Sequence, residues 1–163
     1  MSGRFASILQ IRVQHEKDEK KMETILEYAQ ELARKTQLEN ASHYISAVDV
    51  VQNGFDLKLS SQKLLKDLSN SLKKRYNFDF KISKKLMGVD SENGSDLYRF
   101  NVSLKLIPVE KNDIFSMDQM QYKVEKVIDN KILARNLTKD NIEQINFENF
   151  SKKKWRFLEH ERN

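Results

Sequence analysis

Apolar and polar residues alternate along three segments between Asn53 and Pro108. Every second residue is apolar in 55–59, 78–82 and 98–106, within predicted strands at 55–59, 78–86 and 96–107. Because successive side chains of a β-strand point to opposite faces, this period predicts strands with one buried and one solvated face. The solvated face would carry the residues Asp56, Lys58, Asp79, Lys81, Arg99, Asn101, Ser103 and Lys105. The pattern therefore predicts a half-exposed sheet whose outer face is polar and mostly cationic.

Two other segments have apolar residues at a spacing of three and four. Residues 17–35 and 61–76 show this period, which is typical of amphipathic helices. Further strands are predicted at 5–14 and 44–52, with Asn53-Gly54 as a hairpin turn because both residue types tolerate a positive φ. The order up to Pro108 is thus β-α-β-β-α-β-β. We predict an α+β fold, an antiparallel sheet with two helices on one face.

Pro108 is the predicted domain boundary, because proline cannot donate to a strand ladder. Short segments then read as strands at 114–117, 122–128, 132–135 and 146–150. Several short strands without a long helical pattern predict a small β-barrel. The predicted domains are an α/β domain over residues 1–108 and a barrel over 109–163.

Composition narrows the classes of function. The chain has 163 residues, a net charge of +5 and no cysteine. Without cysteine, disulfides, thiolate metal sites and thiol nucleophiles are excluded. No segment has the apolar length of a signal peptide or a membrane span. We therefore expect a cytoplasmic protein without a membrane partner, or a nuclear and cytoplasmic one if the source is eukaryotic.

Catalytic and metal-binding motifs are missing from the sequence. The histidines, His15, His43 and His160, are far apart and lack the spacing of metal ligands. The glycines, Gly3, Gly54, Gly88 and Gly94, stand singly, so none belongs to a phosphate-binding loop. We expect no enzyme activity, metal, cofactor or small-molecule substrate.

Positive charge is concentrated in residues 63–85, which contain eight Lys and Arg but only two Asp, and again in residues 152–156. The residues alone allow two readings, a solvated lysine face that maintains solubility or a stripe that binds phosphates. Trp155 likewise could stack on a base or close a barrel. The candidate RNA-binding residues are Lys58, Lys63, Lys66, Lys73, Lys74, Arg75, Lys81, Lys84, Lys85, Arg99, Lys152, Lys153 and Lys154.

Five motifs, in their order and spacing, resemble the nonsense-mediated-decay-three family. They are ASILQIR at 6–12, NGFDL at 53–57, KISKKL at 81–86, LYRF at 97–100 and LIP at 106–108. Eukaryotic members of this family are export adaptors of the large ribosomal subunit, and archaea have shorter homologues. The resemblance implies a ribosomal-protein-L22-like α/β domain, then an SH3-type barrel. It also implies that Gly54 supplies a turn and that Lys81, Ser83, Lys84, Lys85 and Arg99 lie on or near a basic surface.

The sequence departs from the family pattern in three respects. It lacks the N-terminal zinc-binding cysteines, a complete oligonucleotide-binding domain and a leucine-rich export tail. We therefore expect an excised fragment or a reduced homologue, and the Lys, Asn and Ile usage suits an archaeal source.

The predicted function is non-enzymatic binding of the large ribosomal subunit, through rRNA and ribosomal proteins, in its biogenesis or in the control of subunit joining. The alternative is a protein-interaction adaptor that takes up a partner peptide at a sheet edge or barrel groove, without nucleic acid.

Overall fold

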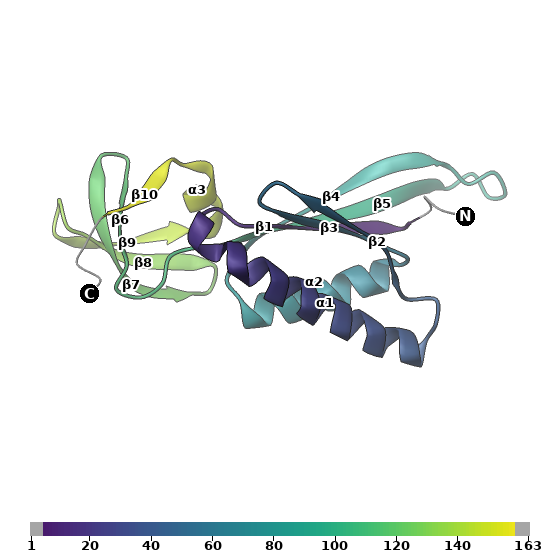
Figure 1. The fold of residues 1–163 in the computed structure, drawn as a ribbon. Helices are drawn as coiled ribbons and strands as arrows, with labels where there is room; N and C mark the ends of the chain where they lie inside the picture. The colour runs from purple at the N-terminus through teal and green to yellow at the C-terminus, as the bar shows by residue number, and fades with distance from the viewer. Residues whose placement is uncertain (1–4, 159–163) are drawn as a thin grey trace. The chain divides into compact units, whose positions relative to one another are not determined.

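The computed structural model describes residues 5–158, which form two compact units (Figure 1). Unit 1 comprises Met1–Tyr76 and Phe80–Leu106, and unit 2 comprises Asn77–Asp79 and Ile107–Asn163. Each unit is built on its own five-stranded sheet. None of the helices in residues 5–158 has the length and apolar content that a membrane crossing requires.

Unit 1 has the predicted order of strands and α-helices, with one short 3-10 helix added. The elements are β1 (Ser7–Arg12), η1 (Glu16–Asp18), α1 (Glu19–Glu39), β2 (Ile45–Val51), β3 (Gly54–Leu59), α2 (Gln62–Arg75), β4 (Phe78–Val89) and β5 (Asp96–Leu106). The strands lie in the order β2-β3-β1-β5-β4. The first and last strands of this order, β2 and β4, are the edges of the sheet.

The sheet of unit 1 is mixed, so the prediction of an antiparallel sheet is wrong for one strand pair. Strand β1 runs antiparallel to β3 but parallel to β5, with Leu9 opposite Val102 and Ile11 opposite Leu104. Side chains alternate in the same way in both kinds of pair, so the apolar pattern carries no information on strand direction.

Both long helices cover the same face of this sheet (Figure 1). The buried core between the layers includes Leu9, Ile11, Ile25, Ala29, Phe55, Leu57, Leu64, Leu68, Leu72 and Leu104. Helix α2 begins after Ser61, whose Oγ accepts a hydrogen bond from the Leu64 N–H at 3.1 Å. This cap satisfies one of the backbone donors that a helix N-terminus leaves free.

The turn between β2 and β3 differs from the predicted Asn53-Gly54 turn. Strand β3 already begins at Gly54, and Asn53 is the residue with a positive φ, of 63°. A Cβ on Gly54 would lie 1.8 Å from the Ile11 carbonyl oxygen. Glycine is therefore required here by the close approach of β1, and not by the conformation of the turn.

Unit 2 contains β6 (Ile114–Met117), β7 (Met120–Ile128), β8 (Lys131–Asn136), β9 (Asn141–Asn146), α3 (Phe147–Lys152) and β10 (Trp155–Phe157). Neighbouring strands are antiparallel, in the order β10-β6-β7-β8-β9. Among residues 5–158, no pairing of β9 with β10 closes this sheet. Its core includes Phe115, Tyr122, Val124, Ile132, Phe147 and Phe150.

One element of unit 2 was predicted wrongly, and two were not predicted. Residues 146–150 were expected to be a strand, whereas Phe147–Lys152 form α3. The Asn146 Oδ1 accepts a hydrogen bond from the Asn149 N–H at 2.7 Å, so Asn146 caps this helix. The short strands β9 and β10 were not predicted from the sequence.

Candidate nucleic-acid interface

The sheet of unit 1 has an open face, on the side opposite to α1 and α2, and β5 supplies part of it. Val102 and Leu104 are buried toward the helices. Because side chains alternate along a strand, the residues between and beside them point to the open face. These are Arg99, Asn101, Ser103 and Lys105, all partly exposed. This confirms the predicted polar side of this strand.

Strand β4 continues the open face at the edge of the sheet. Phe80 and Ile82 line a groove with α2, so Lys81 and Lys85 point to the opposite, open side. Every residue from Phe80 to Val89 is exposed. Three predictions for this strand are therefore wrong: Phe80 and Ile82 are 37% and 59% exposed rather than buried, and Asp79 is 5% exposed rather than solvated.

Acidic residues of the open face lie on β2 and β3 and pair with nearby cations. Asp56 contacts the Arg12 guanidinium at 2.7 Å, and Asp49 lies 3.6 Å from the Lys58 Nζ. In the part of the chain that the structure describes, the open-face cations without a carboxylate partner lie on β4 and β5. They are Lys81, Lys85, Arg99 and Lys105.

An aromatic ring at the start of the described chain holds two of the open-face cations. The Arg99 Cζ is 4.7 Å and the Lys58 Nζ 5.1 Å from the centroid of the Phe5 ring. The Arg99 Nε is buried and has no hydrogen-bond partner. Cation–π contacts of this kind fix the position of a charged group without neutralising it. Nothing in the sequence pattern indicated this role of Phe5.

The cations of α2 have different partners. Lys63 forms an ion pair with Asp67 at 2.8 Å, and this hydrogen bond raises the pKa of Lys63. The Arg75 Cζ lies 4.2 Å from the ring centroid of Tyr28 on α1. Lys74 is exposed and has no partner among the described residues.

A further set of cations lies on the helix side of β4. The Lys73 Nζ is 4.0 Å from the Phe80 ring centroid, and the Lys84 Nζ is 4.4 Å from that of Tyr98. Lys66 lines the groove between α2 and β4, a hollow of about 380 Å³. The structure therefore distributes the predicted cations of unit 1 over both faces of the sheet and along α2, rather than on one face.

The second predicted cluster, in unit 2, is largely paired. Lys152 contacts Glu148 at 2.7 Å, and this hydrogen bond raises the pKa of Lys152. Lys153 contacts Asp118 at 2.6 Å, whereas Lys154 is exposed without a partner among the described residues. The Trp155 ring stacks on Phe150 at 4.9 Å, against the core of unit 2. This contact favours the structural interpretation of Trp155.

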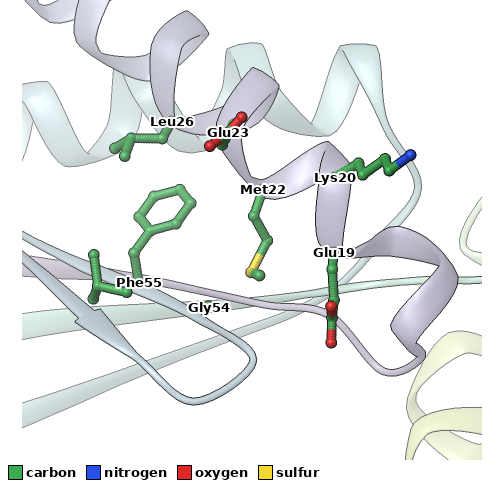
Figure 2. Close-up of a pocket in the computed structure, with 8 residues that line it drawn as sticks. Glu19, Lys20, Met22, Glu23, Leu26, Gly54 and Phe55 are labelled. Atoms are coloured by element: carbon green, nitrogen blue, oxygen red, sulfur yellow. The ribbon is translucent and has the colours of Figure 1, made fainter.

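A second hollow of unit 1, of about 540 Å³, lies between α1 and the β2–β3 hairpin (Figure 2). Met22, Leu26 and Phe55 form its apolar wall, and Glu19 and Glu23 lie beside them on α1. Within residues 5–158, no three His, Cys, Asp or Glu side chains gather as a metal site would require. His160 lies outside the described residues.

Comparison with known proteins gives a family match. The family model described as NMD3, second domain, matches residues 4–106. The matched residues include all the strands and helices of unit 1 and end with β5. They therefore carry the open face and the β4 edge. None of the curated proteins matches the chain.

Proposed function

This chain belongs to the NMD3 family, the nonsense-mediated-decay-three family that its motifs resemble. We therefore propose that it is a non-enzymatic module that binds the large ribosomal subunit. The family resemblance, with its export adaptors of that subunit, supports this role. The proposed partners are rRNA and ribosomal proteins, and the proposed process is maturation of the subunit or control of subunit joining in the cytoplasm. The proposed domains are residues 1–108 and 109–163. For the second, a five-stranded antiparallel order with a short helix before the last strand supports an SH3-type barrel.

The observation that carries the proposal is the unpaired charge of the open face. Lys81 and Lys85 on β4, with Arg99 and Lys105 on β5, have no carboxylate partner among residues 5–158. A cation that neutralises a phosphate releases the counterions bound to that phosphate. This release contributes an affinity that does not depend on the base sequence. The Arg99 guanidinium, held on Phe5, keeps hydrogen-bond donors for a phosphate.

Co-sedimentation with purified large subunits tests this proposal. Lys81→Glu/Lys85→Glu reverses two unpaired cations of the open face, and we expect it to abolish pelleting at moderate salt. The slope of log K against log salt concentration should also fall by about 1.5, since each lost phosphate contact removes about 0.7–0.9.

The matched control is Lys20→Glu/Lys35→Glu, which makes the same charge change at two exposed positions of α1. It should pellet like the wild type. Equal pelleting of both folded double variants would contradict the proposed surface. Binding that does not respond to salt would instead support an adaptor that recognises only protein.

A further inference from the structure

Strand β4 is a free edge of the unit 1 sheet. It pairs on one side with β5 and has no strand on the other in the described part of unit 1. It is 12 residues long, whereas strands usually have about 3–10. The outward N–H and C=O groups of such an edge form a template for one more strand.

Apolar surface accompanies this edge on its helix side. The groove between α2 and β4 has Phe100 and Val102 at its base, and Phe80 and Ile82 along β4. Phe80 is 37% and Ile82 is 59% exposed. A strand added to β4 would place every second side chain beside these residues, because side chains alternate between the faces.

Lysines surround the same edge. Lys81 and Lys85 point to the open face, Lys84 to the helix side, and Lys66 and Lys73 lie across the groove on α2. Lysines on an edge prevent pairing with a second copy of the same strand through charge repulsion. That protective role accounts for the charges but not for the apolar groove. An occupant that suits both features carries acidic and apolar residues.

We propose that the β4 edge binds an extended acidic segment of a partner protein as a sixth strand. Apolar residues at alternate positions of the segment would enter the groove, and acidic residues between them would face Lys81 and Lys85. The site shares these two lysines with the proposed rRNA surface. The proposed rRNA surface does not include the groove, so peptide binding in the groove is separate from the proposed function.

The test uses the full chain and a fluorescently labelled synthetic peptide in which Val and Glu alternate. Anisotropy should show saturable binding that Ile82→Thr weakens about tenfold, the typical effect of losing an apolar contact in a pocket. The matched control is Val50→Thr on the opposite edge strand β2, where the side chain is 81% exposed. It should bind like the wild type.

A second measurement separates strand addition from general attraction of charges. Peptide binding should slow hydrogen exchange of β4 amides, and a peptide N-methylated at every edge-facing amide should not bind. Absence of binding, unchanged exchange in β4, or equal binding by Ile82→Thr and the wild type would overturn the inference. A weaker affinity of Ile82→Thr for an RNA oligonucleotide would also overturn the inference, because the groove would then be part of the RNA-binding surface. Loss of subunit pelleting in Lys81→Glu/Lys85→Glu, with pelleting retained in Ile82→Thr, supports the proposed function whatever the peptide does.

Discussion

At Gly54, a hydrogen atom occupies a place where a Cβ would be 1.8 Å from the Ile11 carbonyl oxygen. The obstacle is backbone in the centre of the sheet, which cannot move aside as a flexible side chain can. In the sequence, Asn53-Gly54 correctly indicated a turn because both residue types tolerate a positive φ, and the family resemblance implied that Gly54 supplies it. The positive φ belongs to Asn53, and Gly54 allows β1 and β3 to lie close together.

We expect Gly54→Ala to lower the free energy of unfolding of unit 1 by about 3 kcal/mol, because β1 and β3 must separate to admit the methyl group. Urea denaturation followed by far-UV circular dichroism measures this. Gly94→Ala is the control, since no atom lies within 4 Å of its Cβ position and its φ is +72°. It should cost only about 1 kcal/mol of backbone strain. Equal losses in the two variants would show that close approach is not the constraint at Gly54.

At the scale of elements, residues 146–152 show how local chemistry overrides an apparent strand. Phe147 and Phe150 are both buried at a spacing of three, which places them on one face of a helical turn, whereas a strand would point them to opposite faces. The Asn146 cap fixes the choice in favour of α3. By contrast, α1 and α2 were predicted from the sequence because their apolar period extends over several turns.

We expect Asn146→Ala to destabilise unit 2 by about 1 kcal/mol, since the capping acceptor for the Asn149 N–H is lost. The fluorescence of Trp155, the single tryptophan of the chain, reports unfolding of this unit in urea. Asn149→Ala is the matched control, because it removes the same side chain and keeps the cap. Asn146→Asp should retain most of the stability. A loss in Asn149→Ala as large as that in Asn146→Ala would argue against capping.

For the whole molecule, the net charge of +5 does not indicate which cations are available to bind a phosphate. Folding pairs Lys153 with Asp118, which is 35 residues away in the sequence, and Lys58 with Asp49. It leaves Lys81 and Lys85 without such partners among the described residues. A lysine whose charge is already balanced has less to gain from a phosphate.

We therefore expect Lys152→Gln/Lys153→Gln and Lys81→Gln/Lys85→Gln to differ in RNA binding, although each removes the same formal charge. The β4 variant should reduce the salt slope by about 1.5, and the unit 2 variant should leave it unchanged. Filter binding of rRNA fragments across a salt series measures both slopes. A fall of the slope in the unit 2 variant would show that these ion pairs open on contact with RNA.

The sequence alone determined the strand and helix order of unit 1, the side of β5 that is buried and the family resemblance. Each of these depends on local spacing, because the alternation of a strand and the period of a helix are properties of one segment. Only the tertiary structure decided that β1 runs parallel to β5, that β4 is an edge with both faces exposed at its far end, and which lysines have carboxylate partners. These features arise from contacts between segments far apart in the chain, and a local pattern does not encode such contacts.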